Sequence, residues 1–124
     1  MTTHSKLSPS KAYRWLACPG SVREESRYPD EPSGPSAIDG THTHSLLEHC
    51  IKNSGDPMRM VGIKMKDHEG EFVVDRDRAD RVTVVLHYIT KQRGMLGTVV
   101  PEQRVHLRHL VGRDDMDGTC DVQI

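Results

Sequence analysis

Aromatic side chains are scarce in this sequence. Phe, Trp and Tyr make up 4% of the 124 residues, and hydrophobic residues of all kinds make up only 35%. Because apolar burial is the dominant favourable term in folding, so lean a composition predicts a thin core for a chain of this length. The length by itself indicates one small domain or part of a larger one.

An excess of charge and a long apolar run are also missing. The formal net charge is −1 although 28% of residues are charged, which argues against a general basic coat for nucleic acid and leaves room for local basic patches. No apolar run reaches the length of a membrane span, and the polar start over 1–6 lacks a signal-peptide apolar region. Cys18, Cys50 and Cys120 are odd in number and widely spaced, as reduced thiols usually are. These absences predict a cytoplasmic protein without membrane association.

The N-terminal quarter of the chain predicts one helix and a loop. Ser8 is a good N-cap and Pro9 suits the first helical position, so a helix is expected over 9–17. The tripeptide Cys18-Pro19-Gly20 should end it, because a residue before proline avoids the α region. The following stretch, 23–39, is polar and rich in Pro, Gly and Ser, which is typical of a surface loop.

Two further helices are expected, over 41–53 and 75–93. Thr41 is the expected N-cap of the first, and Asp75 that of the second. Apolar residues recur at helical spacing in both segments. The expected buried stripes are Leu47, Cys50 and Ile51 in the first helix, and Ala79, Val82, Val85, Leu86 and Ile89 in the second.

The C-terminal part changes to the alternating pattern of strands. Two strands are expected near 98–108 and 119–124, joined by a turn over 112–118. The segment 56–70 looks irregular, and 71–74 is expected to be a short extended lead-in to the third helix. Helices followed by the opening hairpin of a sheet predict the front part of an α/β domain, α+β in character.

A candidate metal ligand lies on the second expected helix. His44 and Glu48 are four residues apart, so their side chains project from one helix face. Histidine binds metals readily, and the Gly40-Thr41 start would let the helix begin close to another backbone. The alternative is a solvated pair without a metal role. His42 should point away from the face of His44 and is expected to be structural.

A carboxylate at the end of the chain is the second candidate. Aspartate is disfavoured inside strands, so Asp121, just after Gly118, needs a reason. A histidine and an aspartate from distant segments can form a site for a hard-to-borderline divalent metal. The alternative for Asp121 is a turn-edge carboxylate bonded to backbone amides. Glu102, on the preceding strand, could approach the same metal or be an exposed strand residue, and the latter is favoured.

Three segments resemble a known family. The stretch Leu7–Ser21 resembles the N-terminal signature of a phage and prophage protein family, the DUF2800 domain, of the PD-(D/E)xK nuclease superfamily, which also holds RecB-like and Cas4-like nucleases. Gly40-Thr41-His42-Thr43-His44, with Leu47 and Glu48, resembles the first nuclease motif of that group, a histidine on a helix. Gly118-Thr119-Cys120-Asp121 is similar to the motif that carries its first metal-binding aspartate.

The resemblance implies a fold, a reaction and a cofactor. It implies a restriction-endonuclease-like core and a metal-dependent DNA nuclease, an exonuclease of phage or prophage recombination. Mg²⁺ or Mn²⁺ would be held by Asp121, a second acidic residue and a backbone carbonyl, with His44 adding a ligand and Glu48 orienting the site. A lysine would help to activate the attacking water. Residues 1–124 would be the N-terminal part of one such domain, divided into 1–22 (helix signature), 23–39 (loop), 40–93 (helices) and 98–124 (hairpin).

The sequence departs from the family pattern after Asp121. No Asp/Glu-x-Lys motif follows it, and the Gln and Tyr motif of RecB-like nucleases is absent. The 124-residue chain alone is therefore expected to be inactive in DNA cleavage. The alternative function is a catalytically inactive short form that binds DNA, a phage recombination protein or a second protomer, and regulates rather than cuts.

An iron–sulfur cluster is not expected. Cys18 matches the position of the first cluster cysteine in Cas4-like relatives, but the later cysteines are absent, and Cys50 and Cys120 lack the required spacing. Cys18 is therefore expected to be a buried structural thiol.

Overall fold

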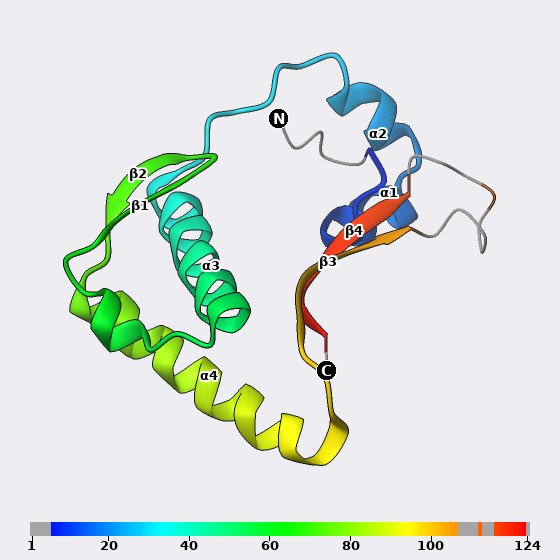
Figure 1. Ribbon diagram of the computed structural model, residues 1–124. Helices are drawn as coiled ribbons and strands as arrows, with labels where there is room; N and C mark the ends of the chain where they lie inside the picture. Colours follow the sequence, from blue (N-terminus) through cyan, green and yellow to red (C-terminus); the bar gives the residue numbers. More distant parts are fainter. Residues whose placement is uncertain (1–5, 107–111, 113–115, 124) are drawn as a thin grey trace. The chain divides into compact units, whose positions relative to one another are not determined.

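The computed structural model describes residues 6–106, 112 and 116–123, without the side chains of residues 95 and 96 (Figure 1). The chain divides into two compact units. The first is Met1–Pro32 with Gln103–Cys120, and the second is Ser33–Glu102 with Asp121–Ile124. Over the described ranges the fold is mixed α+β, with four α-helices and two two-stranded antiparallel sheets, which confirms the predicted fold class. The prediction of a single nuclease-like domain stays a prediction.

The first unit begins with three short helical segments. They are η1 (Pro9–Lys11), α1 (Ala12–Ala17) and α2 (Gly20–Glu25). The predicted first helix is confirmed as η1 running into α1. The predicted loop is wrong at its start, because Pro19 adopts helical angles (φ −57°, ψ −27°) and a new helix begins at Gly20. A proline excludes the α region for the residue before it but fits the entry to the next helix.

Side-chain contacts hold these short helices together. The Trp15 indole N–H donates to the Ser8 carbonyl at 3.1 Å. Lys11 and Arg14 of η1 and α1 both pair with Glu25 of α2. None of the three segments contains a buried residue. Cys18, between α1 and α2, is accordingly exposed, so the prediction of a buried thiol is wrong.

Two strands complete the first unit and enter the second. They are β3 (Val100–His106) and β4 (Asp117–Gln123), which pair with each other. They match the two predicted strands; the predicted ends at 107–108 and at Ile124 lie outside the described residues. Gly118 of β4 lies against Pro9 of η1. A Cβ at Gly118 would come within 2.9 Å of the Pro9 Cγ and 3.1 Å of its Cδ.

Replacing Gly118 by alanine is therefore expected to destabilise the first unit. A proline ring cannot turn aside as a flexible side chain does, so overpacking of about 1–3 kcal/mol is expected. The measurement is urea unfolding followed by tryptophan fluorescence, because Trp15, the only tryptophan, belongs to this unit. The control is Gly20→Ala in the same unit, since a Cβ at Gly20 would meet only the Cys18 Sγ at 3.9 Å, an ordinary contact distance. Equal stability of Gly118→Ala and the wild type would contradict the contact.

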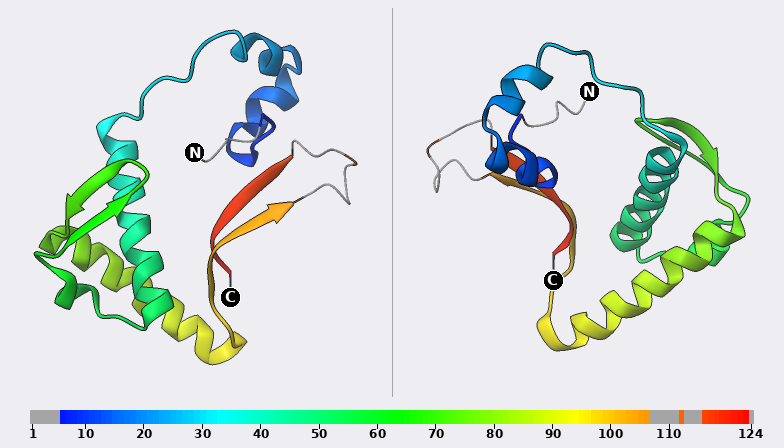
Figure 2. Two further views of the ribbon diagram at one scale, coloured as in Figure 1. Left: turned by 45° about the horizontal axis from the view of Figure 1, so that its top comes forward. Right: turned by 180° about the vertical axis from the view of Figure 1, so that it is seen from behind.

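The second unit contains two long helices and a hairpin (Figure 2). Its elements are α3 (Pro35–Asn53), η2 (Pro57–Met60), β1 (Lys64–Asp67), β2 (Gly70–Val73) and α4 (Arg76–Leu96). The β1–β2 hairpin pairs Lys64 with Val73 and Asp67 with Gly70. Strand β1 lies where an irregular segment is expected, whereas β2 largely coincides with the expected extended stretch over 71–74. The sequence does not predict the hairpin itself. Each strand has only four residues, too few for alternation to reveal it.

Helix α3 starts earlier than predicted. Gly34 is its N-cap and Pro35 its first residue, whereas Thr41 lies inside the helix, so the predicted loop over 23–39 is also wrong at its end. The extra turn carries Asp39, which binds Arg78 and Arg81 of α4 at 2.6 and 2.9 Å. The Arg81 and Arg78 guanidinium groups lower the pKa of Asp39 to about 2. This charge cluster joins the start of α3 to α4.

Helix α4 largely follows its prediction. Asp75 is the N-cap, and its side chain accepts the Arg78 backbone N–H at 2.7 Å. The helix continues to Leu96, three residues beyond the expected end, before Gly97 stops it at φ 102°. Most of the expected stripe faces the interior; Val85, at 40% exposure, does not.

The core of the second unit lies where α3, β2 and α4 meet. Its buried apolar members are Leu46, Cys50, Phe72, Val74, Ala79 and Val82. On α3 the burial falls on Leu46 and Cys50, while the predicted Leu47 and Ile51 are half-buried. This is the thin core that the composition predicts. Burial and the charge of Asp56 both raise the pKa of the Cys50 thiol.

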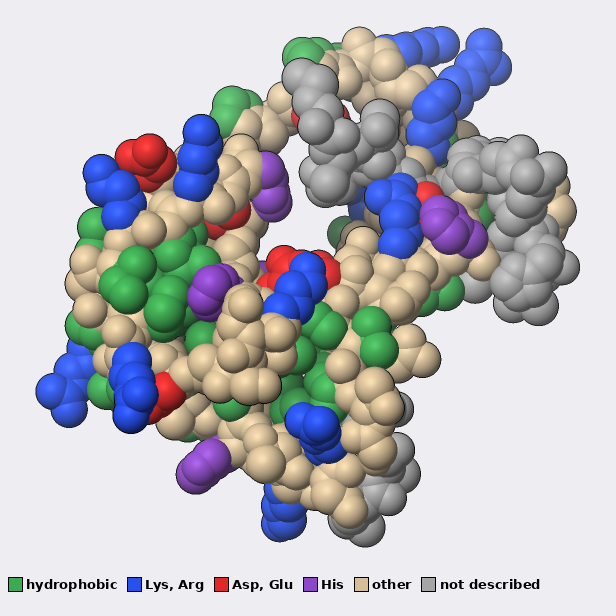
Figure 3. Space-filling view, in the orientation of Figure 1, with side chains coloured by type: hydrophobic (Ala, Val, Ile, Leu, Met, Phe, Trp, Pro, Cys, Tyr) green, Lys and Arg blue, Asp and Glu red, His purple; other side chains and the backbone are tan. Residues whose placement is uncertain are grey.

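The surface carries mixed charge. On the face shown in Figure 3, Lys and Arg side chains are scattered among acidic ones rather than gathered in one patch. Within the described residues, no helix is both long enough and apolar enough to cross a membrane.

Candidate metal centre

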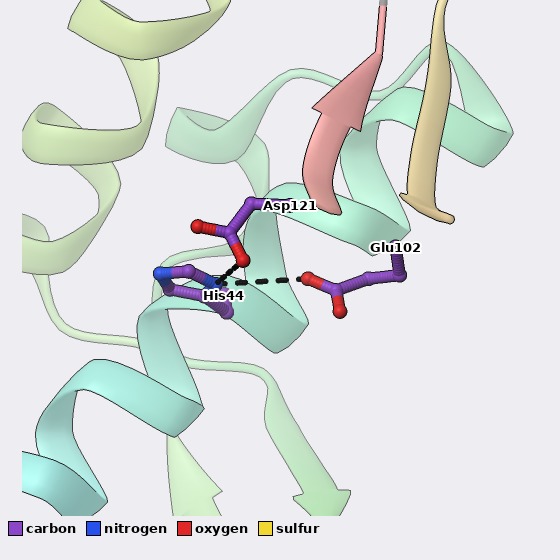
Figure 4. Close-up of side chains that lie close together, drawn as sticks. All are labelled: His44, Glu102 and Asp121. Carbon is purple, nitrogen blue, oxygen red and sulfur yellow. Dashed lines mark ion pairs between the residues drawn. The ribbon is translucent and has the colours of Figure 1, made fainter. Parts of the chain in front are cut away.

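Three side chains from three elements of the second unit converge. They are His44 of α3, Glu102 of β3 and Asp121 of β4, and each offers a ligand atom within 4.8 Å of the others (Figure 4). The His44 Nδ1 lies 3.5 Å from the Asp121 Oδ1 and 3.6 Å from the Glu102 Oε1. The predicted approach of His44 to Asp121 is therefore observed.

Helical spacing directs His44 towards the two carboxylates. The buried positions of α3 are His42, Leu46 and Cys50, each four residues from the next. His44 lies half-way between two of them, about 200° around the helix from each, so it points away from the core. The sequence suggested that Gly40 would let the helix approach another backbone. This is not observed, because a Cβ at Gly40 would meet nothing within 4 Å.

Glu102 has an unusual backbone. Its φ of 49° lies in the left-handed region, which a side chain other than glycine rarely adopts. The conformation costs on the order of 1–2 kcal/mol and persists only where the surroundings enforce it, as happens at functional sites. The side chain points towards His44 (Figure 4). It is half-buried in the cluster, so the prediction of an exposed strand residue is wrong.

The charges in the cluster repel one another. Burial raises the pKa of Glu102, the negative charge of Asp121 raises it further, and His44 opposes both. Glu48 adds to the repulsion from one turn further along α3, where it pairs with Lys52. Glu48 is therefore not one of the three converging ligands. Its effect on the cluster is electrostatic, because its negative charge raises the pKa of Glu102. A cation placed among the carboxylates would relieve this repulsion.

The donor set fits a divalent cation. Ligands about 2.1 Å from one ion lie about 3.0 to 3.4 Å apart in octahedral or tetrahedral geometry, so the observed separations of 3.5 and 3.6 Å need only small rotations. One imidazole and two carboxylates suit Mn²⁺ and also Mg²⁺. The side chains of His44 and Asp121 are 48% and 63% exposed, which leaves room for water to complete the coordination.

A second polar cluster in this unit was not predicted. The His42 Nδ1 lies 2.7 Å from the Asp67 Oδ2, and the Ser45 hydroxyl donates to the same oxygen. The His42 ring stacks on Phe72 with centroids 4.2 Å apart. His42 is buried, as its expected structural role requires. No sequence signal pointed to Asp67, because its strand was not recognised.

Comparison with known proteins identifies the family. A family model described as a protein of unknown function (DUF2800) matches residues 4–124. No solved structure matches the chain. The chain therefore belongs to the DUF2800 family.

Proposed function

We propose that these residues of the DUF2800 protein form the ion-binding part of a metal-dependent DNA nuclease of the PD-(D/E)xK superfamily, and that His44, Glu102 and Asp121 hold its ion. The convergence of these three side chains carries the proposal. They come from a helix and two strands, and Glu102 reaches the cluster through a strained backbone. An accidental surface contact would not require that strain.

The three ligands would differ in the charge that they bring to the ion. Asp121 and Glu102 supply negative charge for a divalent ion, and His44 supplies a neutral nitrogen. Glu48, through its charge, keeps the carboxylate side of the site electronegative. Bound Mg²⁺ or Mn²⁺ would polarise a phosphoryl oxygen and lower the pKa of bound water. The exposure of His44 and Asp121 leaves the site open to a substrate as large as DNA.

A nuclease assay on linear duplex DNA tests this function. The 124-residue chain is expected to leave the DNA intact with Mg²⁺ or Mn²⁺, because no Asp/Glu-x-Lys motif follows Asp121. A DUF2800 protein that carries the motif after the matching aspartate is expected to cut. Asparagine in place of that aspartate should lower cleavage by at least about 10³-fold, as expected when a metal ligand of a hydrolase is lost.

Binding and cleavage together separate the proposed function from its alternative. DNA binding that survives the aspartate substitution, with cleavage lost, supports a nuclease. DNA or protein binding without cleavage in every family member tested supports the inactive binding or regulatory module. Cleavage that the aspartate substitution leaves unchanged would overturn the assignment of Asp121.

A further inference from the structure

A separate cavity lies in the first unit, among the short N-terminal helices. Its volume is about 660 Å³. The apolar part of its lining consists of Leu7, Trp15, Leu16, Pro19 and Val22. Leu16 is 69% exposed although it is a large apolar side chain. An exposed apolar concavity of this kind is typical of a binding site.

Two cations beside this cavity form no ion pair with any described residue. Lys6 and Arg23 also line it. Among the described residues neither side chain forms an ion pair, whereas Lys11, Arg14 and Arg27 nearby pair with Glu25 or Glu24. The two glutamates of α2, Glu24 and Glu25, therefore pair with cations that do not line the cavity. The described lining of the cavity therefore carries positive charge and contains no carboxylate.

We propose that this cavity binds an acidic peptide segment of a partner protein through one large apolar side chain. The apolar side chain would lie among Trp15, Leu16 and Val22, and flanking carboxylates would pair with Lys6 and Arg23. Apolar anchors in a desolvated pocket supply most of the affinity at such sites, and surrounding charges supply specificity. The proposal is independent of the ion site in the second unit.

The lining favours a peptide over single-stranded nucleic acid. Proteins that bind single strands stack successive bases on several aromatic rings along a basic groove. Here Trp15 is the only aromatic residue among the described residues of the lining, and its N–H is already bound to the Ser8 carbonyl. Leu7, Leu16 and Val22 are aliphatic and suit a leucine or phenylalanine side chain.

Tryptophan fluorescence of the whole chain tests the proposal directly, because Trp15 is the only tryptophan and lines the cavity. The probe is a synthetic peptide with a run of aspartates followed by leucine and phenylalanine. Saturable binding with a shift in the Trp15 emission is expected. The same peptide with lysines in place of the aspartates should bind at least about tenfold more weakly, because like charges would then face each other.

Matched variants locate the binding site. Arg23→Glu and Leu16→Ser are each expected to weaken binding by about tenfold, the usual loss at a central contact residue. The controls are Arg27→Glu and Tyr13→Ser, which change exposed residues outside the cavity and should alter affinity less than about twofold. Far-UV circular dichroism establishes that each variant is folded.

Three results would overturn the proposal. They are no saturable fluorescence change, affinity that Arg23→Glu and Leu16→Ser leave unaltered, and tighter binding of oligo(dT) than of the acidic peptide. The last result would assign the cavity to nucleic acid instead.

Discussion

Asparagine at position 121 is expected to lower the affinity of the protein for Mn²⁺ by at least about tenfold, since one of only two anionic ligands becomes neutral. Glu102→Gln should have an effect of similar size. Asp30→Asn is the matched control, because it removes a carboxylate from an exposed loop position outside the cluster. The Mn²⁺ affinity of the wild type and of the three variants is measured by electron paramagnetic resonance, which detects the free Mn²⁺.

The chemical nature of the three ligands predicts which divalent ion binds more tightly. His44 contributes an imidazole, which Mn²⁺ accepts more readily than Mg²⁺, a hard cation that prefers oxygen and keeps its waters. Mn²⁺ is therefore expected to bind more tightly than Mg²⁺ in a competition titration, and His44→Ala should reduce that preference. The absolute affinity should be weak, because two of the three ligands are largely exposed.

Two results would contradict this site. One is Mn²⁺ binding that Asp121→Asn and Asp30→Asn weaken equally, since this would indicate only a general loss of negative charge. The other is tighter Mg²⁺ than Mn²⁺ binding in the wild type, because the imidazole would then not be a ligand. The first result also removes the support for the proposed nuclease function, whereas the second removes only His44 from the ligand set.

The elements that the sequence predicted well are those with strong local signals. Asp75 followed by apolar residues at helical spacing located the start of α4, and Ser8-Pro9 located the start of the first helix. The start of α3 is less evident, because Pro35 lies in a Pro-, Gly- and Ser-rich stretch that is typical of a loop, although proline is also favoured in the first turn of a helix. The long-range charge pairs of Asp39 with Arg78 and Arg81 stabilise the added start of α3, and composition does not reveal them.

In the candidate metal site, too, local sequence features predict some residues, whereas others depend on contacts between distant segments. His44 and Asp121 stood out because each residue type was unusual for its segment, a histidine on a polar helix face and an aspartate in a strand. Glu102 was only a secondary candidate, because a glutamate on a strand is commonly solvated. Its left-handed backbone and its burial against His44 depend on the pairing of β3 with β4. Those features arise only from tertiary structure.

Asp67→Asn is expected to destabilise the second unit by about 2–3 kcal/mol at neutral pH, as the loss of hydrogen bonds to a buried charged group usually does. The Asp67 side chain is 7% exposed and accepts three bonds, from His42, Ser45 and the backbone N–H of Glu69. Asparagine has one oxygen and one NH₂ group, so the charge-assisted bonds are lost. His42 and Ser45 would also have to change from donors to acceptors to keep their contacts. The cluster holds β1 against α3, and its loss should free that edge of the hairpin.

The pH dependence of this difference provides the sharper test. Burial tends to raise the pKa of Asp67, but hydrogen bonds from His42, the Glu69 backbone and Ser45 outweigh it, so the pKa is lowered. An aspartate in the unfolded chain titrates at about 3.9. The stabilisation is therefore fully present above about pH 4, and it disappears as the pH falls through the lower folded value. The advantage of the wild type over Asp67→Asn should be constant down to about pH 4 and shrink below it.

Urea unfolding followed by circular dichroism at helical wavelengths measures this difference, because α3 and α4, the two long helices, both belong to the second unit. Asp80→Asn, an exposed change on α4, is the control and should shift the free energy of unfolding by less than about 0.5 kcal/mol at any pH. A wild-type advantage that persists unchanged far below pH 4 would mean that Asp67 stabilises the unit without its charge. An equal loss of stability in the two variants would mean that the buried contacts with His42 and Ser45 contribute nothing.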